Sequence, residues 1–493
     1  MRIGFDNDQY IRMQAERIRR RIDQFGGKLY LEFGGKLFDD YHASRVLPGF
    51  APDSKARMLR SLADDAEVLV AVCAYDIENN KRRSDIGISY GEDTLRLMDL
   101  FASMGLAANK VVITRFTGQP HAEAFQRRLE AMGVQVYRHY PITGYPANTA
   151  TIVSEEGFGK NDFAETDRPL VVVTAPGPGS GKLATCLSQL YHEHARGQQA
   201  GYAKFETFPV WNLELTHPVN IAYEAATADL DDRNIIDPFH LEAYGEITVN
   251  YNRDVETFPV VKDLLDRIQG ESPYQSPTDM GVNMVGNCIT DDDCCRTAAR
   301  QEIVRRHFWT AVQLERTGIG EAALAKIDLL MGKADVDEDF SPAHRAALDK
   351  EEQTGFPAAA MVLPDNTVVT GKTSEIMGAA SSLLLKALKR VAGIPDDHYI
   401  VSDDALKPIC DLKTGHLHSN NPRLHSDEIL IALSISSASN DEAARAIEAA
   451  DKLAGCDAYF SVIISPTDEK LYRDLGINVC CEPKYEGTKL YHR

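Results

Sequence analysis

The sequence contains no long apolar run. No segment approaches the ~20 consecutive apolar residues that a membrane-spanning helix requires. The first residues, Met1 to Asp6, also lack the apolar core of a secretory signal peptide. Both absences predict a cytoplasmic protein that has no membrane partner.

The cysteines do not form a disulfide framework. The chain has nine, an odd number, scattered through apolar segments, which predicts reduced thiols. The adjacent pairs Cys294-Cys295 and Cys480-Cys481 lack the C-x-x-C spacing and the partner histidines of a zinc site. We therefore expect no structural metal at these pairs.

A basic surface is also missing. The formal net charge of -20 argues against nucleic acid or an anionic membrane as the main partner, because both require a basic face. Hydrophobic residues make up 44% and charged residues 26%, the balance of a soluble globular protein with large cores. At 493 residues the chain should divide into about three domains of ~150 residues.

Short strands and helices alternate along the first half of the chain. This pattern predicts an α/β fold with an open, mainly parallel sheet in an N-terminal body, a helical linking segment and a separate C-terminal α/β domain. The expected boundaries are 1–165 for an N-terminal α/β domain, 166–300 for an α/β segment with a phosphate-binding loop, 301–355 for the helical linker and 356–493 for the C-terminal domain. Strands are expected at 29–33, 67–76, 110–116, 134–140, 201–207 and 458–464, a hairpin at 360–370, and helices at 374–391 and 441–453, while the apolar run 429–435 is ambiguous.

The most informative stretch is 169–182, an apolar run that passes into a glycine-rich loop ending in lysine. A helical pattern follows until Gly197, so the loop joins a strand to a helix. Backbone N–H groups and the helix dipole can there bind one anion, to which the lysine adds a charge. The predicted phosphate-binding residues are Gly177, Gly179, Ser180, Gly181 and Lys182.

The loop departs from the nucleotide-binding consensus G-x-x-x-x-G-K-[ST]. Pro176 replaces the first glycine, and Leu183 replaces the hydroxyl residue that normally binds magnesium. The alternative is a tight strand-to-helix turn that binds nothing, although its three glycines and lysine exceed what a turn requires. Both interpretations stay open at this stage.

Further candidates follow the loop. The strand predicted at 201–207 delivers Lys204 and Glu206 to its carboxyl end, the edge where ligands bind in open α/β sheets. The segment 217–283 is dense in polar residues and interrupted by prolines, which is typical of loops that converge on a site. Within it, Asp237 and His240 are candidates for an acid/base pair or for metal ligands. Asp237 can equally be a helix cap before a proline, with His240 on the first turn.

Three histidines lie close together near the C-terminus. His416, His418 and His425 could share a divalent ion. No H-x-E or C-x-x-C arrangement is nearby to complete such a site, and histidines in a loop after Gly415 are more typical of a surface or an interface.

The chain resembles the bacterial family called domain of unknown function 1846. The segments that carry the resemblance are Leu29–His42, Ala175–Lys182, Ala200–Trp211, His217–Asn220, Asp237–His240, Tyr251–Asp254, Ser276–Asn283 and Leu475–Asn478. The resemblance covers the whole chain and implies a bacterial cytosolic protein with an N-terminal α/β body and a distinct C-terminal domain. It implies no particular reaction.

A second, local resemblance covers residues 169–206. Strand, glycine loop, helix and second strand are similar to the start of the dethiobiotin synthetase and CTP synthase group of nucleotide-dependent ligases. In that group a lysine on the second strand, matched here by Lys204, approaches the transferred phosphoryl group. The resemblance implies ATP or another nucleotide as cofactor. Because Leu183 departs from the usual hydroxyl ligand, carboxylates such as Glu206 or Asp237 are the candidate magnesium ligands.

Three functions are compatible with these features. The first is a nucleotide- or phosphate-dependent enzyme of ligase or phosphotransferase type, with Lys204 neutralising charge during transfer and Asp237 and His240 in supporting catalytic roles. The second is an enzyme that binds a phosphorylated metabolite without a nucleotide. The third is a non-catalytic anion sensor. All three predict a small anionic or phosphorylated ligand, and we expect a homo-oligomer with contacts from helix 374–391 or run 429–435.

Overall fold

The chain folds into two compact units. The computed structural model describes residues 2–34, 37–38, 40–83 and 86–487. The N-terminal unit comprises Arg2–Glu224 and Asp232–Arg296, and the C-terminal unit comprises Ala225–Asp231 and the chain from Thr297 onward. Within the described residues no helix is both long and apolar enough to cross a membrane. All nine cysteines are free thiols.

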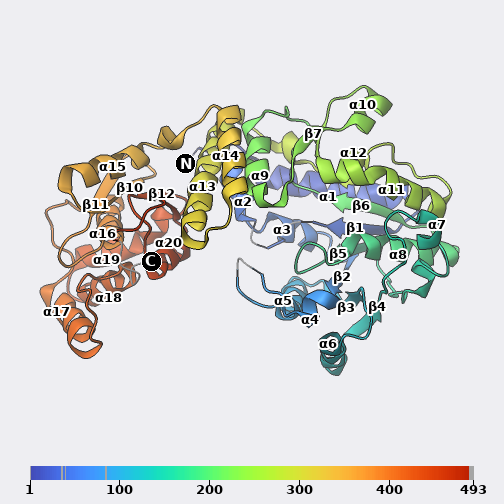
Figure 1. Cartoon of the computed structure of the whole chain (residues 1–493), viewed down its shortest axis with the longest axis horizontal. Helices are drawn as coiled ribbons and strands as arrows, with labels where there is room; N and C mark the ends of the chain where they lie inside the picture. Colours follow the sequence, from blue (N-terminus) through green and yellow to red (C-terminus); the bar gives the residue numbers. More distant parts are fainter. Residues whose placement is uncertain (1, 35–36, 39, 84–85, 488–493) are drawn as a thin grey trace. The chain divides into compact units, whose positions relative to one another are not determined.

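A seven-stranded parallel sheet forms the centre of the N-terminal unit (Figure 1). Its strand order is β4-β3-β2-β5-β1-β6-β9, and every neighbouring pair is parallel. The central strands β2 and β5 are buried along their whole length, which explains their unbroken apolar sequences. The strands are β1 (Leu29–Phe33), β2 (Ala66–Cys73), β3 (Ala107–Thr114), β4 (Gln135–Arg138), β5 (Leu170–Thr174), β6 (Gly201–Phe205) and β9 (Gly281–Val282), beside a small antiparallel pair of β7 (Asn234–Ile236) and β8 (Val249–Tyr251).

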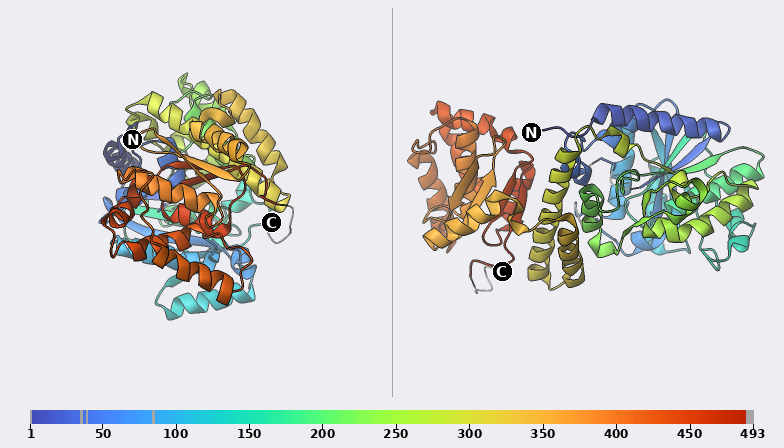
Figure 2. Two further views of the ribbon diagram at one scale, coloured as in Figure 1. Left: turned by 90° about the vertical axis from the view of Figure 1, so that its left-hand side faces the viewer. Right: turned by 90° about the horizontal axis from the view of Figure 1, so that it is seen from above.

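Helices cover both faces of this sheet. In the second view of Figure 2, the blue helix α1 and the yellow-green helix α11 lie on opposite sides of the strands. The face that carries Tyr30, Val173 and Tyr202 packs against apolar residues of α8 and α11. The helices are α1 (Asn7–Gln24), α2 (Tyr41–Val46), α3 (Ser54–Arg60), α4 (Ala74–Glu78), α5 (Tyr90–Ser103), α6 (Pro120–Ala131), α7 (Thr149–Ile152), α8 (Lys182–Ala195), α9 (Pro218–Ala226), α10 (Pro238–Tyr244), α11 (Asn252–Gln269) and α12 (Pro277–Met280), with short 3-10 turns η1 (Phe158–Lys160) and η3 (Val285–Cys288).

The C-terminal unit has its own mixed four-stranded sheet. Its order is β11-β10-β12-β13, in which β10 pairs antiparallel with β11 and β12, and β12 pairs parallel with β13. The strands are β10 (Ala358–Val362), β11 (Val368–Lys372), β12 (Asp457–Phe460) and β13 (Asn478–Cys481). The helices are α13 (Asp292–Thr317), which begins in the N-terminal unit, α14 (Glu321–Ala334), α15 (Pro342–Thr354), α16 (Ala379–Val391), α17 (Asp403–Asp411), α18 (Ser426–Ser436), α19 (Asp441–Glu448) and α20 (Pro466–Asp474), with short turns η2 (Ala228–Leu230), η4 (Glu338–Phe340), η6 (Ala450–Leu453) and a π-helical turn η5 (Leu412–His416).

The predicted α/β class, with a mainly parallel sheet and a separate C-terminal domain, is confirmed. The boundary expected after residue 165 falls between strands of one sheet, because β1 to β4 precede it and β5, β6 and β9 follow it. The strand expected at 67–76 ends at Cys73, where α4 begins. The ambiguous run 429–435 is helical and belongs to α18.

Helix α16, which we expected to offer subunit contacts, buries its apolar side chains in the core of its own unit. Leu383, Leu384 and Leu388 all belong to the cluster that packs against the C-terminal sheet. On α18, Ile431 and Ile435 stay exposed. Homo-oligomerisation remains a prediction.

Candidate active site at the carboxyl edge of the parallel sheet

The glycine-rich loop lies at the centre of the parallel sheet. It leaves β5, whose neighbours are β2 and β1, and enters α8 at Lys182. Gly179 has φ +76° and Gly181 has φ +90°, so both adopt the left-handed backbone region that glycine tolerates best. Gly181 is also the N-cap of α8. The loop therefore presents its backbone to the N-terminus of a 14-residue helix.

Contacts with the surrounding chain fix the loop through its carbonyl groups. The hydroxyl of Thr114, at the end of β3, donates to the Ser180 carbonyl at 2.8 Å, and the Ser180 hydroxyl donates to the Gly177 carbonyl at 3.0 Å. A Cβ atom on Gly177 would lie only 2.2 Å from the Tyr90 hydroxyl. The glycines of the loop thus have a packing or conformational role whether or not the loop binds a ligand.

The backbone amides of the loop are left free. The N–H groups of Gly177, Gly179, Ser180 and Gly181 have no hydrogen-bond acceptor among the described residues. The half-buried Lys182 follows them at the first helical position. Unpaired amides that precede a helix N-terminus form an anion-binding concavity. Phosphate binding by this loop remains a prediction.

Lys204, near the end of β6, is the centre of a buried cluster of charges. Its ammonium pairs with Glu206 Oε1 at 2.9 Å and with Asp254, and it donates to the Tyr251 hydroxyl. Tyr251 is the N-cap residue of α11 and Asp254 is in its first turn, so the β8–α11 junction positions both. Burial lowers the pKa of Lys204, but the Asp254 and Glu206 carboxylates raise it more, so the net pKa lies well above its ordinary value and the ammonium stays charged.

Glu206 is a buried acid with one unpaired oxygen. Its side chain is 4% exposed. Oε2 has no hydrogen-bond partner among the described residues. Burial raises the pKa of Glu206 to about 8, with Lys204 opposing the shift and Asp254 adding to it. The raised pKa favours the acid form of this side chain, in which it can donate a proton, more than in an ordinary glutamate.

Trp211 supplies a second unpaired polar atom. Trp211 Nε1 is buried and has no acceptor among the described residues. A Cβ atom on Gly281 would lie 2.4 Å from Trp211 Cζ2 and 3.3 Å from Glu206 Oε2, so the indole and the acid approach the same glycine. The unpaired indole N–H is suited to an acceptor group of a ligand.

The loop and the lysine cluster share one edge of the sheet. Val173 of β5, Glu32 of β1 and Lys204 of β6 are register partners in adjacent strands. Two strand spacings correspond to about 10 Å. Burial raises the pKa of Cys186 on α8. The charge of Glu32 adds to this shift and the charge of Lys182 opposes it, so both charges act on the same thiol.

Replacement of Glu206 by glutamine tests its acid form. Because the folded pKa is raised to about 8 from 4.5, protonation favours the folded state. The free energy of unfolding of the wild type should fall by up to about 1.4 kcal/mol for each pH unit between pH 5 and 8, and then level off. Glu206→Gln should lack this decline in urea unfolding at pH 6 and 8. The exposed Glu242→Gln serves as control, and parallel wild-type and Glu206→Gln pH profiles would contradict the assignment.

Asp237 and His240 lie in a different setting. Asp237 is the N-cap of α10: Oδ1 accepts from the amides of Phe239 and His240, and Oδ2 accepts from the amide and hydroxyl of Thr278. His240 Nδ1 contacts the Ser276 hydroxyl at 2.8 Å. The two residues thus have structural partners, as the helix-cap interpretation expects, and their catalytic roles remain predictions.

The predicted metal ligands Glu206 and Asp237 have separate partners. Glu206 pairs with Lys204, and Asp237 with α10 and Thr278. Within the part of the chain that the structure describes, no three His, Cys, Asp or Glu side chains group as a metal site. Magnesium at Glu206 and Asp237 therefore stays a prediction from sequence.

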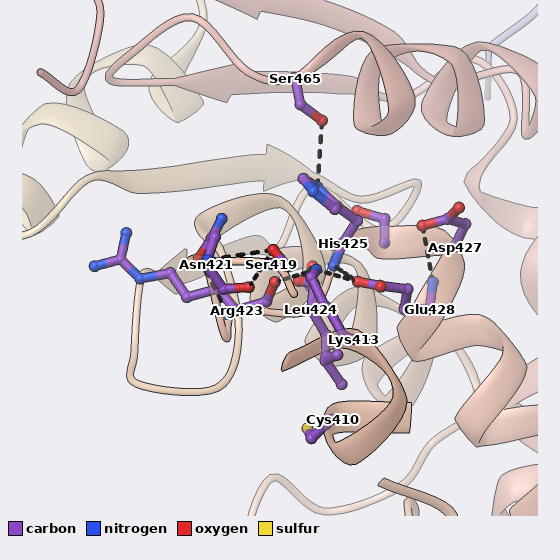
Figure 3. A network of polar contacts seen from close by, with 12 residues as sticks. Cys410, Lys413, Ser419, Asn421, Arg423, Leu424, His425, Asp427, Glu428 and Ser465 are labelled. Atoms are coloured by element: carbon purple, nitrogen blue, oxygen red, sulfur yellow. Dashed lines mark hydrogen bonds and ion pairs between the residues drawn. The ribbon is translucent and has the colours of Figure 1, made fainter. Parts of the chain in front are cut away.

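The histidines near the C-terminus do not converge. His425 Nδ1 contacts Asp468 Oδ2 at 3.1 Å. It also contacts the Ser465 hydroxyl at 3.3 Å, as Figure 3 shows. The same figure shows Lys413, whose ammonium donates to Glu428 at 2.7 Å and to the Arg423 carbonyl. This network fixes the loop that precedes α18. His416 and His418 are exposed.

Sequence reasoning did not single out several residues of the site. Tyr251, Asp254, Glu32 and Trp211 lie within the segments that carry the family resemblance. None of the four was predicted to be a site residue. Asp254 lies fifty residues beyond Lys204, so nothing in the local pattern signalled their pairing. The segment 29–42 continues past Glu32 through residues 35, 36 and 39, which lie outside the described residues.

Comparison with known proteins accounts for the whole chain. The family model "Domain of unknown function DUF1846, N-terminal" matches residues 3–335, and "Domain of unknown function DUF1846, C-terminal" matches residues 339–491. A UPF0371 protein of Corynebacterium urealyticum is 55% identical over 492 residues, which cover 100% of this chain and 99% of the relative. A UPF0371 protein of Streptococcus thermophilus is 53% identical over 490 residues, 99% of each chain. The chain therefore belongs to the bacterial DUF1846 family, also called UPF0371.

Proposed function

We propose that this protein is a phosphate-dependent enzyme, of ligase or phosphotransferase type, that binds a nucleotide phosphate at residues 175–182. The observation that carries the proposal is the set of unpaired amides from Gly177 to Gly181, which precedes the helix N-terminus and Lys182. An anion there would gain several hydrogen bonds, the helix dipole and one positive charge. The expected ligand is a small phosphorylated molecule of the cytoplasm.

Lys204 and Glu206 supply the groups that such chemistry needs. A charged lysine can neutralise the charge that develops on a transferred phosphoryl group. Glu206 in its acid form can donate a proton to a leaving oxygen, and the unpaired Nε1 of Trp211 can bind an acceptor atom of the second substrate. The loop and the cluster follow strands that lie two positions apart at the same edge of the sheet, which suits a ligand that spans both.

Nucleotide binding would bring its own magnesium, because Mg²⁺ is usually held by substrate phosphates together with one or two carboxylates. Leu183, in the position of the usual hydroxyl ligand, favours a second candidate, in which the loop binds a phosphorylated metabolite without a nucleotide. The non-catalytic anion sensor predicts binding at the same loop without turnover.

Thermal unfolding separates these functions. We expect ATP with magnesium to raise the melting temperature, because a ligand present at 100 times its Kd stabilises the folded state by about 2.7 kcal/mol. Inorganic phosphate, ADP and sugar phosphates, each with and without magnesium, complete the series. Stabilisation by a sugar phosphate alone would favour the metabolite enzyme. Product formation, followed by phosphate release or ADP formation, separates either enzyme from a sensor.

The matched variants are Lys182→Ala and Lys470→Ala. Lys470 lies on α20 with a 75% exposed side chain, far in sequence from the loop. Lys182→Ala should lose most of the ligand-induced shift while its unliganded melting temperature stays within a few degrees, whereas Lys470→Ala should respond as the wild type does. Full ligand stabilisation of Lys182→Ala would reject the phosphate-loop assignment.

A further inference from the structure

The C-terminal unit contains a cavity of about 530 Å³, lined by residues other than those of the sheet edge described above. Two histidines line it, His307 on α13 and His344 on α15. The other lining residues are Asp328, Met331, Gly332, Val336, Asp337, Glu338, Asp339, Arg345 and Leu348. Four acidic residues line the cavity, and three of them, Asp328, Glu338 and Asp339, already pair with a histidine or with Arg345. This pairing disfavours a cation as the ligand of the cavity.

His344 is bonded to a carboxylate at each ring nitrogen. Nδ1 lies 2.8 Å from Asp339 Oδ1, and Nε2 lies 2.7 Å from Glu482 Oε1. The His344 side chain is 7% exposed. A neutral imidazole has one N–H donor and one acceptor, whereas ionised carboxylates only accept. Both contacts can be hydrogen bonds at the same time only if His344 is a doubly protonated imidazolium.

His307 on α13 also faces two carboxylates. Its Nδ1 shares a hydrogen bond of 2.8 Å with Asp328 Oδ1, and its Nε2 lies 3.1 Å from Glu338 Oε1. Glu338 and Asp339 are consecutive residues of the turn η4, so His307 of α13 and His344 of α15 both contact this turn. Arg345 adds a further bond to Asp339.

We propose that residues 337–340, three of which line this cavity, form a proton-dependent clasp that is held against α15 while His344 is an imidazolium ion and that loosens when His344 loses a proton. Loss of one proton turns one ring nitrogen of His344 from a donor into an acceptor that faces a carboxylate. His344 then keeps one of its two bonds. Loosening of the clasp moves the carboxylates that line the cavity.

The groups around His344 support this direction. Burial lowers its pKa, but the hydrogen bonds and charges of Glu482 and Asp339 outweigh burial and raise the pKa above the ordinary value of 6.5. From α13 and β12, the uncharged rings of Phe308 and Tyr459 face the imidazole at 5.1 Å and 5.9 Å between centroids. The further charges are peripheral: Arg345 binds Asp339, and Lys484, two residues beyond Glu482, pairs with Glu351.

The sign of the pH effect follows from the raised pKa. The stabilisation by His344 is complete below about pH 6.5, the unfolded value, and is lost as pH rises through the higher folded value. Hydrogen–deuterium exchange of the full chain measures this directly. After correction for the intrinsic rate, amides of 336–345 should exchange several-fold faster at pH 9 than at pH 6, because the raised pKa of His344 places the loss of its proton between these two values.

Two variants and one control make the test decisive. His344→Gln should exchange rapidly at both pH values, and Glu482→Gln, which keeps an acceptor but removes the charge, should shift the transition to lower pH. Among the described residues, His398 bonds one carboxylate, Glu442, so His398→Gln should leave the transition unchanged. A wild-type exchange rate at 336–345 that does not change with pH, or an NMR titration of His344 below pH 6.5, would overturn the proposal. If His344→Gln does not fold, Glu482→Gln and the NMR titration carry the test.

Discussion

Replacement of Lys204 by methionine is expected to lower the free energy of unfolding by about 3–5 kcal/mol, the usual cost of leaving a buried charge without its partner. Asp254 would lose its ammonium partner, and Glu206 would lose the hydrogen bond at Oε1. Methionine retains much of the length and apolar volume of the lysine stem, so the loss reports charge rather than a cavity. Urea unfolding at pH 7, followed by the fluorescence of Trp211 in a Trp309→Phe background, measures the change near the site.

The double variant Lys204→Met with Asp254→Asn separates charge from packing. Removal of both charges should recover most of the lost stability, because a neutral amide costs far less to bury than an unpaired carboxylate. Enzymatic turnover should stay abolished in the double variant, since the proposed function needs the ammonium itself. A single variant as stable as the wild type would mean that the cluster is hydrated rather than dry.

Replacement of Arg305 by leucine is the second change for which we expect a large effect, again about 3–5 kcal/mol. Arg305 lies on α13 and is 6% exposed. Its Nε and Nη2 donate to the two oxygens of Asp457 on β12 at 2.6 Å and 2.8 Å, and Nη1 donates to Glu302 at 3.1 Å. Leucine has no donor to replace this bidentate pair. Asp457 would therefore be left without its guanidinium partner beside the core of the C-terminal unit.

Arg316 on the same helix provides the control for Arg305. It pairs with Glu469 at 3.0 Å, but both side chains are about one-third exposed. Exposed pairs contribute about 0.2–1 kcal/mol, so Arg316→Leu should change stability little. Unfolding followed by Trp309 fluorescence in a Trp211→Phe background reports the C-terminal unit. Equal losses in both arginine variants would show that charge burial is not the cause.

The elements that could be predicted from sequence are those whose pattern is local. Strands β1 and β5 and the loop up to Lys182 were recognisable because a central parallel strand is buried on both faces and reads as an apolar run. The following helix and the placement of Lys204 near the carboxyl end of β6 follow from the same logic.

The features that could not be predicted from sequence depend on contacts between residues far apart in the chain. Helix α11 was hidden among polar residues and contains Pro259, which sequence rules associate with a helix boundary. The pairing of Lys204 with Asp254 forms only once that helix packs against the sheet. The polar density of 217–283 was interpreted as one site, but much of it is used in caps and backbone hydrogen bonds, as for Asn220 with the amide and carbonyl of Val210.

The position of β1 affects how the chain can fold during its synthesis. Although β1 is the first strand to leave the ribosome, both of its neighbours, β5 and β6, are made much later. Until residue 205 has emerged, the nascent chain carries β1 with at least one unpaired edge, and such edges are prone to wrong pairing. The N-terminal unit therefore closes late and over long sequence distances, so the growing chain is a natural client for chaperones throughout that interval.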